Sequence, residues 1–358
     1  MNPLHALHEL GQAVWLDAIR RSYLDEGGYL DGLIGTREIS GLTSNPSIFA
    51  AALASDDAYT PALGELAGAD AAEAFWSLIT ADTQAACDRF LPLWHDTAGL
   101  HGHVSLEVHP SHADDTEATV SEALLLSAQI DRPNLMVKVP ATEAGLSAVT
   151  RLLAEGISVN VTLLFSVARY EASVDAFLAG LRRRAEAGGD LSRVTSVASF
   201  FVSRFDGKVD PQLAAGHPLR GSAGIANARA AYATFRELSS TERFAELAAE
   251  GARVQRPLWA STSTKDPAYP DTMYVDALAG PDTVNTMPEA TLDAVREGAQ
   301  PADRLTGTLQ SAQETLGQLA AEGVDLGRIT EELEAEGIRA FARDFDAAVA
   351  TIGRALAR

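Results

Sequence analysis

Short segments rich in β-branched and aliphatic residues alternate with longer, alanine-rich helical segments along all 358 residues. The expected strands begin near Val14, Glu38, Val104, Leu135, Ser158, Thr195, Pro257 and Thr283, and a helical pattern follows each of them. Strict alternation predicts parallel strands, because a parallel pair needs a long crossover and an intervening helix provides it. Eight such units predict a closed (β/α)8 barrel, the TIM-barrel architecture.

The main alternative is an open, doubly wound α/β sheet. Such sheets usually carry a glycine-rich phosphate loop directly after a strand, and this sequence has none. One unit illustrates the local logic of the barrel interpretation. A strand from Leu135 to Val139 is stopped by Pro140, Thr142 provides a helix cap, and Gly156 ends the helix that follows.

Two segments exceed what a minimal barrel needs. Residues 206–256 separate the sixth and seventh expected strands and contain a loop rich in Gly and Pro, followed by helix. Residues 303–358 are almost wholly helical. We expect both to be additions to one barrel domain spanning residues 1–358: an insertion at about 206–256 and a helical C-terminal extension at about 303–358.

The charge balance limits the classes of partner. The chain has 28 basic and 49 acidic side chains and a formal net charge of −21. Nucleic acid and anionic membranes are therefore not expected as partners, because both require a basic face. A small phosphorylated substrate needs only a local cluster of donors and stays compatible with the sequence.

The remaining composition points to the cytoplasm. Apolar runs stay well below the ~20 residues of a membrane span, and the first ten residues do not have the pattern of a secretory signal. Cys87 is the single cysteine, so an internal disulfide is excluded, and its helical context predicts a buried thiol. The sequence is compatible with a homodimer as well as with a monomer.

Lysine is rare here, with three residues against twenty-five arginines, and one of the three lies in an apolar run. Lys138 stands in Asn134-Leu-Met-Val-Lys-Val-Pro140. Burial in an apolar wall disfavours the ammonium form and makes an amine a usable nucleophile at neutral pH. The alternative is a lysine at a strand end whose head reaches water.

Strand parity places several polar residues on the inner face of the barrel. If the aliphatic residues face the helices, the polar residues between them share the lumen. The outward set is Val104, Leu106, Val108, Leu135, Val137, Val139, Val159, Val161 and Leu163. The inward set is Ser105, Glu107, His109, Met136, Lys138, Asn160 and Thr162, and the first strand ends at Asp17.

Several of these polar residues lie towards the C-terminal ends of their strands, where barrel enzymes keep their catalytic groups. A lysine, two carboxylates and an asparagine directed at one spot indicate either an active site or an ion-pair network. As an active site, a neutral Lys138 would attack a ketone or aldehyde and form a Schiff base. The iminium would accept electrons as a C–C bond breaks, while carboxylates move protons. This chemistry requires no metal and no organic cofactor.

Four histidines, His101, His103, His109 and His112, flank Glu107 and suggest a metal site as an alternative. His103 and His109 share the same parity but lie roughly 20 Å apart on an extended strand, at ~3.3 Å per residue. They would ligate one ion only if the strand bent. We therefore expect no metal.

Several motifs spread over the chain resemble those of transaldolases. They are Gly41-Leu-Thr-Ser-Asn-Pro-Ser-Ile-Phe49, Val104-Ser-Leu-Glu-Val108, Val137-Lys-Val-Pro-Ala-Thr142, Asn160-Val-Thr-Leu-Leu-Phe-Ser166, Ser199-Phe-Phe-Val-Ser-Arg204 and Glu336-Gly-Ile-Arg-Ala-Phe341. The Thr-Ser-Asn-Pro-Ser run is characteristic of the family. The resemblance covers nearly the whole chain, and the family fold is a (β/α)8 barrel.

The resemblance implies a role for each matched residue. Lys138 would form the Schiff base with the ketose C2, Asp17 would accept the C4-hydroxyl proton, and Glu107 with Thr162 and a water would shuttle protons at the carbinolamine. Asn45 and Asn160 would hold hydroxyls of the dihydroxyacetone unit, and Thr43 and Ser47 would shape the loop. Ser199 and Arg204 resemble the phosphate contacts of the family, and Phe201 its aromatic wall.

The implied reaction moves a dihydroxyacetone unit from sedoheptulose 7-phosphate to glyceraldehyde 3-phosphate, which gives erythrose 4-phosphate and fructose 6-phosphate. One position departs from the pattern. Many relatives have a second arginine two residues after the serine that ends strand seven; Ser261 is that serine here, and Ser263 stands in place of the arginine. Lys265 is a candidate for the missing charge, and a solvated loop lysine is the alternative.

Two other functions compete with transaldolase. Fructose-6-phosphate aldolases resemble this family but tend to have Gln at the position of Glu107 and Tyr at the position of Phe201, so both residues favour transfer. A barrel that only binds sugar phosphates would be expected to have lost at least one of Asp17, Glu107 and Lys138, and all three are present.

Overall fold

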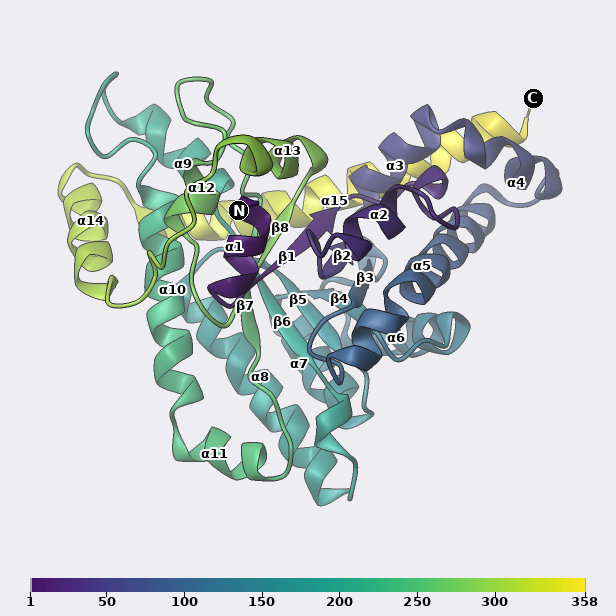
Figure 1. Cartoon of the computed structure of the whole chain (residues 1–358), viewed down its shortest axis with the longest axis horizontal. Helices are drawn as coiled ribbons and strands as arrows, with labels where there is room; N and C mark the ends of the chain where they lie inside the picture. The colour runs from purple at the N-terminus through teal and green to yellow at the C-terminus, as the bar shows by residue number, and fades with distance from the viewer. Residues whose placement is uncertain (1, 358) are drawn as a thin grey trace.

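The computed structural model describes residues 2–357 and has eight parallel strands that close into a barrel in sequence order (Figure 1). The last strand pairs with the first, so the ring is complete. The predicted (β/α)8 barrel is confirmed. Its strands are β1 (Gln12–Asp17), β2 (Gly41–Thr43), β3 (His103–Glu107), β4 (Leu135–Pro140), β5 (Val159–Leu164), β6 (Ser196–Phe201), β7 (Arg256–Ala260) and β8 (Thr283–Met287).

Helices surround the strands, and three further helices follow the last strand in the part of the sequence that the structure describes. Within residues 2–357, no helix combines the length and apolar character needed to cross a membrane. The α-helices are α1 (Pro3–Glu9), α2 (Tyr29–Gly35), α3 (Pro46–Ser55), α4 (Thr60–Glu65), α5 (Ala71–Asp96), α6 (Thr116–Ile130), α7 (Glu143–Ala154), α8 (Val167–Glu186), α9 (Ser203–Val209), α10 (Ala223–Ser239), α11 (Glu242–Ala249), α12 (Met273–Ala277), α13 (Glu289–Gly298), α14 (Leu309–Ala321) and α15 (Leu326–Leu356).

The β4–α7 unit forms for the reasons that its sequence suggests. Thr142 is the N-cap of α7, and its Oγ1 accepts a hydrogen bond from the Gly145 amide at 2.9 Å. A Cβ at Gly145 would lie 1.9 Å from the carbonyl oxygen of Pro140, so only glycine fits this close strand–helix turn. Leucine and valine side chains bury the inner face of α7, and Gly156 stops the helix with a φ of +88°.

The lower half of the barrel lumen is filled mainly by apolar side chains, with His103 of β3 among them. Trp15, Met136, Val197, Leu258 and Val284 point inward from five strands and belong to one buried cluster. A larger cluster fills the layer between strands and helices. The apolar floor fixes the height at which polar side chains begin, because only the C-terminal ends of the strands remain for them.

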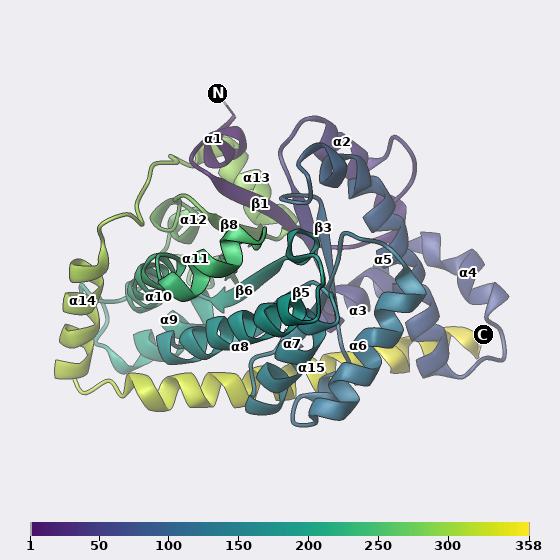
Figure 2. The ribbon, with the colours of Figure 1, turned by 90° about the horizontal axis from the view of Figure 1, so that it is seen from below.

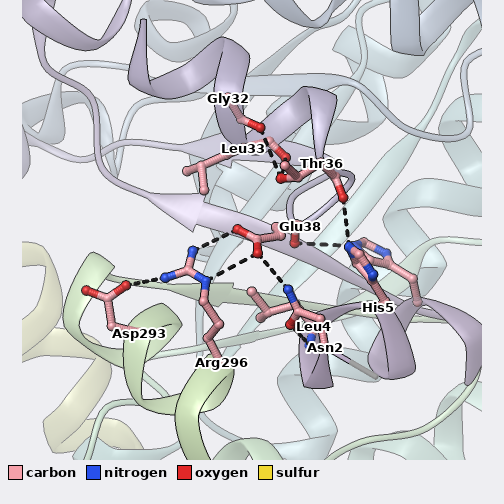
Figure 3. A network of polar contacts seen from close by, with 10 residues as sticks. Asn2, Leu4, His5, Gly32, Leu33, Thr36, Glu38, Asp293 and Arg296 are labelled. Atoms are coloured by element: carbon pink, nitrogen blue, oxygen red, sulfur yellow. Dashed lines mark hydrogen bonds and ion pairs between the residues drawn. The ribbon is translucent and has the colours of Figure 1, made fainter.

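The start of the second strand was predicted too early. β2 begins at Gly41, and Glu38 lies in the connection before it, where its carboxylate accepts hydrogen bonds from Arg296 (2.7 Å) and Asn2 (2.6 Å) (Figure 3). Arg296 also pairs with Asp293. The guanidinium lowers the pKa of Glu38, because it stabilises the ionised carboxyl group. This network joins the chain before β2 to α13 and to the N-terminal segment.

Strand β5 contains a bulge that reverses its expected parity near its end. Between Val161 and Leu164 the register with β6 shifts, and Leu163 takes a φ of +61°. Leu163 was expected to face the helices; it instead belongs to the same buried cluster as the lumen residues. Leu164 takes the outward place instead and packs in the strand–helix layer.

The last two helices pack on the barrel in different places. α14 lies beside α10 (Figure 1). α15 is 31 residues long and contacts α3, α5, α9 and the β5 strand, so it passes over the C-terminal end of the barrel. Figure 2 shows it running along one side of the molecule towards α4. The C-terminal helix is therefore in a position to cover the site.

The packing of Trp15 against Gly41 gives a test of the lumen. A Cβ on Gly41 would lie 2.6 Å from the Trp15 indole, so we expect Gly41→Ala to lower the free energy of unfolding by about 1–3 kcal/mol through overpacking. Gly32→Ala is the matched control, because that Cβ would meet open space in α2 and should stabilise by about 0.5–1 kcal/mol through helix propensity. Chemical denaturation measures both; equal midpoints for the two variants would contradict the packing.

Candidate active site

The C-terminal ends of neighbouring strands bring the predicted polar residues together. Asp17 of β1 is paired in register with Thr43 of β2, Glu107 of β3 with Lys138 of β4, and Lys138 with Asn160 of β5. Parallel strands in register place these side chains at similar heights along the barrel axis. The sequence-predicted groups therefore meet in one place above the apolar floor.

Lys138 is 5% exposed, and its amine has three close neighbours. Its Nζ lies 3.5 Å from Oε2 of Glu107 and donates a hydrogen bond of 3.2 Å to the carbonyl oxygen of Ser44. The ring of Phe341, from α15, has its centroid 5.7 Å from the same nitrogen. The amine thus lies among a carboxylate, a carbonyl and an aromatic ring, and little of the side chain is exposed.

Glu107 is buried beside that amine, and burial raises its pKa from 4.5 to about 7. The charge of Lys138 opposes the shift, because an ammonium ion favours the ionised carboxyl group. Its Oε2 makes no hydrogen bond within the described residues, and neither does the buried Oγ1 of Thr162. A carboxyl group with a pKa near neutrality is suited both to donating and to accepting a proton.

Asp17 is held at the end of β1 by Thr43. The Thr43 hydroxyl donates to Oδ1 of Asp17 at 2.6 Å and lies 3.2 Å from the hydroxyl of Thr286. Burial raises the pKa of Asp17, while Lys138, the Thr43 hydrogen bond and Arg204 act in the opposite direction. Asp17 is therefore a second carboxyl group whose ionisation depends on the lysine.

Two asparagines occupy different positions around the site. Asn160 is fully buried, donates to Ser105 Oγ at 3.1 Å and accepts from Ser199 Oγ at 2.6 Å, so its amide is fixed in orientation. Asn45 is the N-cap of α3, and its Oδ1 accepts from the Ile48 amide and from Ser47 Oγ. Its Nδ2 is left as a donor at the edge of the site.

Arg204 lies between two aromatic rings. Its guanidinium carbon is 5.1 Å from the centroid of Phe201 and 5.9 Å from that of Phe341. Burial lowers the pKa of Arg204, and its charge reaches both Glu107 and Asp17, whose pKa values it lowers. A partly desolvated guanidinium at the mouth of the barrel, near the C-terminal ends of the strands, is a suitable group for binding an anion.

The loop after β7 lies close to the start of α9, the helix that carries Arg204. Ser261 has a φ of +56°, and its hydroxyl lies 2.9 Å from that of Ser203 at the start of α9. Lys265 is exposed and donates to Ser263 Oγ at 2.7 Å. Its charge also acts to lower the pKa of Asp17.

The histidine positions correct one prediction. His109 was expected in the lumen, but β3 ends at Glu107, and His109 packs against Phe345 with a centroid distance of 4.1 Å. His103 is a buried lumen residue bonded to the carbonyl of Gly99, and burial lowers its pKa to about 4. Within residues 2–357, no three His, Cys, Asp or Glu side chains gather as metal ligands.

Two neighbours of the amine were missed by the sequence analysis. The first is the Ser44 carbonyl, a backbone group that carries no side-chain signal. The second is Phe341, which lies about 200 residues further along the chain than Lys138. Phe341 belongs to the family-like motif Glu336–Phe341, but helical periodicity does not indicate which strand a helix crosses.

The ion pair at the centre of the site gives a test that does not depend on activity. In Lys138→Met, we expect the pKa of Glu107 to rise above the value of about 7, because the ammonium ion that favours the carboxylate is gone. Carbon-13 NMR of labelled glutamate, assigned with Glu107→Gln, measures the titration. Lys208→Met is the control, since Lys208 pairs with Glu336 near the surface. An unchanged or lower Glu107 pKa in Lys138→Met would contradict the pairing.

The chain is similar to known proteins over nearly its whole length. The sequence profile of the family described as Transaldolase/Fructose-6-phosphate aldolase matches residues 14–352. A protein of Parafrankia sp. (strain EAN1pec) named Transaldolase is 49% identical over 358 residues, covering 98% of this chain and 97% of that protein. Proteins with the same name from Mycobacterium tuberculosis (strain ATCC 25618 / H37Rv) and Acidothermus cellulolyticus are each 49% identical, covering 95% and 100% of this chain and 94% and 98% of their own. The chain belongs to the transaldolase/fructose-6-phosphate aldolase family.

Proposed function

We propose that this protein is a transaldolase that transfers a dihydroxyacetone unit from sedoheptulose 7-phosphate to glyceraldehyde 3-phosphate through a Schiff base on Lys138. The products are erythrose 4-phosphate and fructose 6-phosphate, and the reaction belongs to the non-oxidative pentose phosphate pathway. The observation that carries the proposal is the Lys138 amine, buried 3.5 Å from a Glu107 carboxyl group whose pKa is about 7.

In the first stage the Lys138 amine attacks the ketose C2. A carbinolamine forms and loses water to give an iminium ion. Glu107 would supply the proton that converts the C2 hydroxyl into water, and would take one back in the reverse step, through a water held with Thr162. Glu107 Oε2 and Thr162 Oγ1 support this role, since neither makes a hydrogen bond to the described protein residues.

In the second stage Asp17 would take the proton from the C4 hydroxyl. The C3–C4 bond breaks, its electron pair moves to the iminium carbon–nitrogen system to give an enamine, and the aldehyde leaves. The enamine then attacks the carbonyl of the acceptor aldehyde, and Asp17 returns its proton to the new hydroxyl. The raised pKa of Asp17 supports a group that gives the proton back.

The remaining predicted residues would bind the substrate. Asn45 and Asn160 would hold hydroxyls of the dihydroxyacetone unit, with Thr43 orienting Asp17. Ser199, Arg204, Ser261 and Lys265 would hold the phosphate group, and Phe201 would form the wall beneath Arg204. Their location on β2, β5 and β6, at the N-termini of α3 and α9 and in the loop after β7 supports an extended sugar phosphate lying across the mouth of the barrel.

We also propose that the whole chain is one barrel domain working in the cytoplasm without a cofactor. The contacts of α15 with α3, α5 and α9 support the single domain, because the C-terminal extension packs on the barrel at several points. An obligate dimer is not required, since the proposed catalytic residues all come from one chain.

Borohydride trapping tests the proposed function. We expect reduction in the presence of fructose 6-phosphate to leave an adduct of dihydroxyacetone size on Lys138, located by peptide mass spectrometry. Lys208, which pairs with Glu336 outside the barrel mouth, is the internal control and should stay unmodified. An unmodified Lys138 in folded protein would overturn the mechanism and favour a barrel that only binds sugar phosphates.

Adding erythrose 4-phosphate separates transfer from simple cleavage. A transaldolase should form sedoheptulose 7-phosphate and release little free dihydroxyacetone. Release of dihydroxyacetone at the same rate with and without the acceptor would instead indicate a fructose-6-phosphate aldolase.

Lys265 gives a separate test of the phosphate site. We expect Lys265→Ala to raise the Michaelis constants for phosphorylated substrates several-fold and to leave kcat nearly unchanged, because a charge–phosphate contact contributes to binding of ground state and transition state alike. Steady-state kinetics with fructose 6-phosphate, and with unphosphorylated fructose as the control donor, measures this. Unchanged Michaelis constants for both phosphorylated substrates would show that Lys265 is a solvated loop residue.

A further inference from the structure

A basic pocket lies outside the barrel mouth, between α9 and α15. It has a volume of about 380 Å³ and is lined by Arg204 and Lys208 of α9 and by Glu336, Arg339 and Arg343 of α15. Figure 2 shows α9 beside the N-terminal part of α15. The volume lies in the range of small-molecule pockets, roughly 300–1,000 Å³.

The charge of this pocket runs against that of the whole chain. Four cationic side chains line it, together with the carboxylate of Glu336, which bonds to Lys208 at 2.6 Å. Asp344, Glu107 and Asp17 also act on Arg204, but they do not belong to the lining. The local balance is positive, whereas the chain as a whole carries a formal net charge of −21. A negatively charged protein repels an anionic sugar phosphate at long range, so a local basic region is needed to draw it in.

Arg339 and Arg343 have no structural partner that explains them. The ion pairs of α15 within the described residues are made by Glu334, Glu336 and Arg328, the last with Glu332. Arg339 and Arg343 are both exposed and stand four residues apart, so their like charges share one helix face. Such a pair is slightly destabilising, which an anion in the pocket would reverse.

The pocket is joined to the amine by a short series of contacts. Arg204 lines the pocket, and its guanidinium carbon lies 5.9 Å from the centroid of Phe341. The same ring lies 5.7 Å from Lys138 Nζ. An anion held beside Arg204 is therefore separated from the reacting amine by one aromatic ring.

We propose that Arg339 and Arg343, together with Arg204 and Lys208, form a docking pocket for the phosphate group of an incoming sugar phosphate. The inference rests on the proposed function, because it assigns the capture of substrates to that same site. The two α15 arginines would act before the chemical step, by raising the rate at which phosphorylated substrates reach Arg204. They are specificity-determining residues for charged substrates and do not touch the reacting atoms.

The test compares Arg339→Gln/Arg343→Gln with a charge-matched control. Arg328→Gln/Arg354→Gln removes the same net charge from the two ends of α15, away from the pocket, so any difference reports position. All four arginines are exposed, so both variants should fold. The assay measures kcat and kcat/KM for fructose 6-phosphate with erythrose 4-phosphate at ionic strengths of about 0.02 M and about 0.3 M.

We expect kcat/KM of the pocket variant to fall about fivefold to tenfold at low ionic strength and by less than about twofold at high ionic strength, where salt screens the field. Its kcat, and its activity with unphosphorylated fructose as donor, should equal those of the control. A pocket variant equal to the control at low salt would overturn the proposal. A loss that persists at high salt, or that extends to fructose, would also overturn it.

Titration calorimetry with inorganic phosphate separates this inference from the proposed function. Wild-type and control proteins should bind phosphate more tightly than the pocket variant at low ionic strength. If the wild-type protein transferred no dihydroxyacetone unit but kept this difference, the proposed function would fail and the anion pocket would stand. If phosphate bound equally to all three proteins, or to none, the pocket would be overturned whatever the activity.

Discussion

The chemistry of the site depends on the burial of charged groups at the C-terminal end of the barrel. The apolar cluster below and the ring of Phe341 above bury these groups. Burial raises the pKa of Glu107 and Asp17 and lowers that of Arg204, so each group on its own would lose its charge more readily. Opposite charges nearby act against these shifts, and a change at one residue therefore changes the pKa of the others.

This mutual dependence suits a group that must both give and take protons. With a pKa near 7, Glu107 has comparable populations of acid and carboxylate at neutral pH. An exposed glutamate would be ionised and a poor proton donor, whereas a buried one without Lys138 nearby would be a poor acceptor. The 3.5 Å separation from the amine thus couples the nucleophile to its proton shuttle.

Much of this arrangement could be predicted from the sequence because it follows from local periodicity. Alternation along β3, β4 and β5 placed Glu107, Lys138, Asn160 and Thr162 on one face, since a strand has a strict period of two. The errors have specific physical causes. A bulge turned Leu163 inward, and hydrogen bonds from Arg296 and Asn2 held Glu38 outside β2. Neither feature has a periodic signal, because both depend on residues far away in the chain.

The position of Phe341 over Lys138 also could not be predicted, because it depends on how α15 packs on the barrel. Gly337, Phe341 and Phe345 stand four residues apart and share one face of α15. A Cβ added to Gly337 would lie 2.9 Å from Cδ2 of Leu163. The glycine therefore allows α15 to approach β5 closely. One turn beyond Phe341, Phe345 packs edge-on against Phe75 of α5 at 4.8 Å.

The ring of Phe341 is therefore fixed by packing on both sides. On the proposed substrate route, α15 keeps this packed position and substrate passes beside it. The α9 side, where Arg204 separates the basic pocket from the mouth, is the side whose charge favours that route. In this proposal the same helix covers the amine with Phe341 and directs the anionic substrate around its edge.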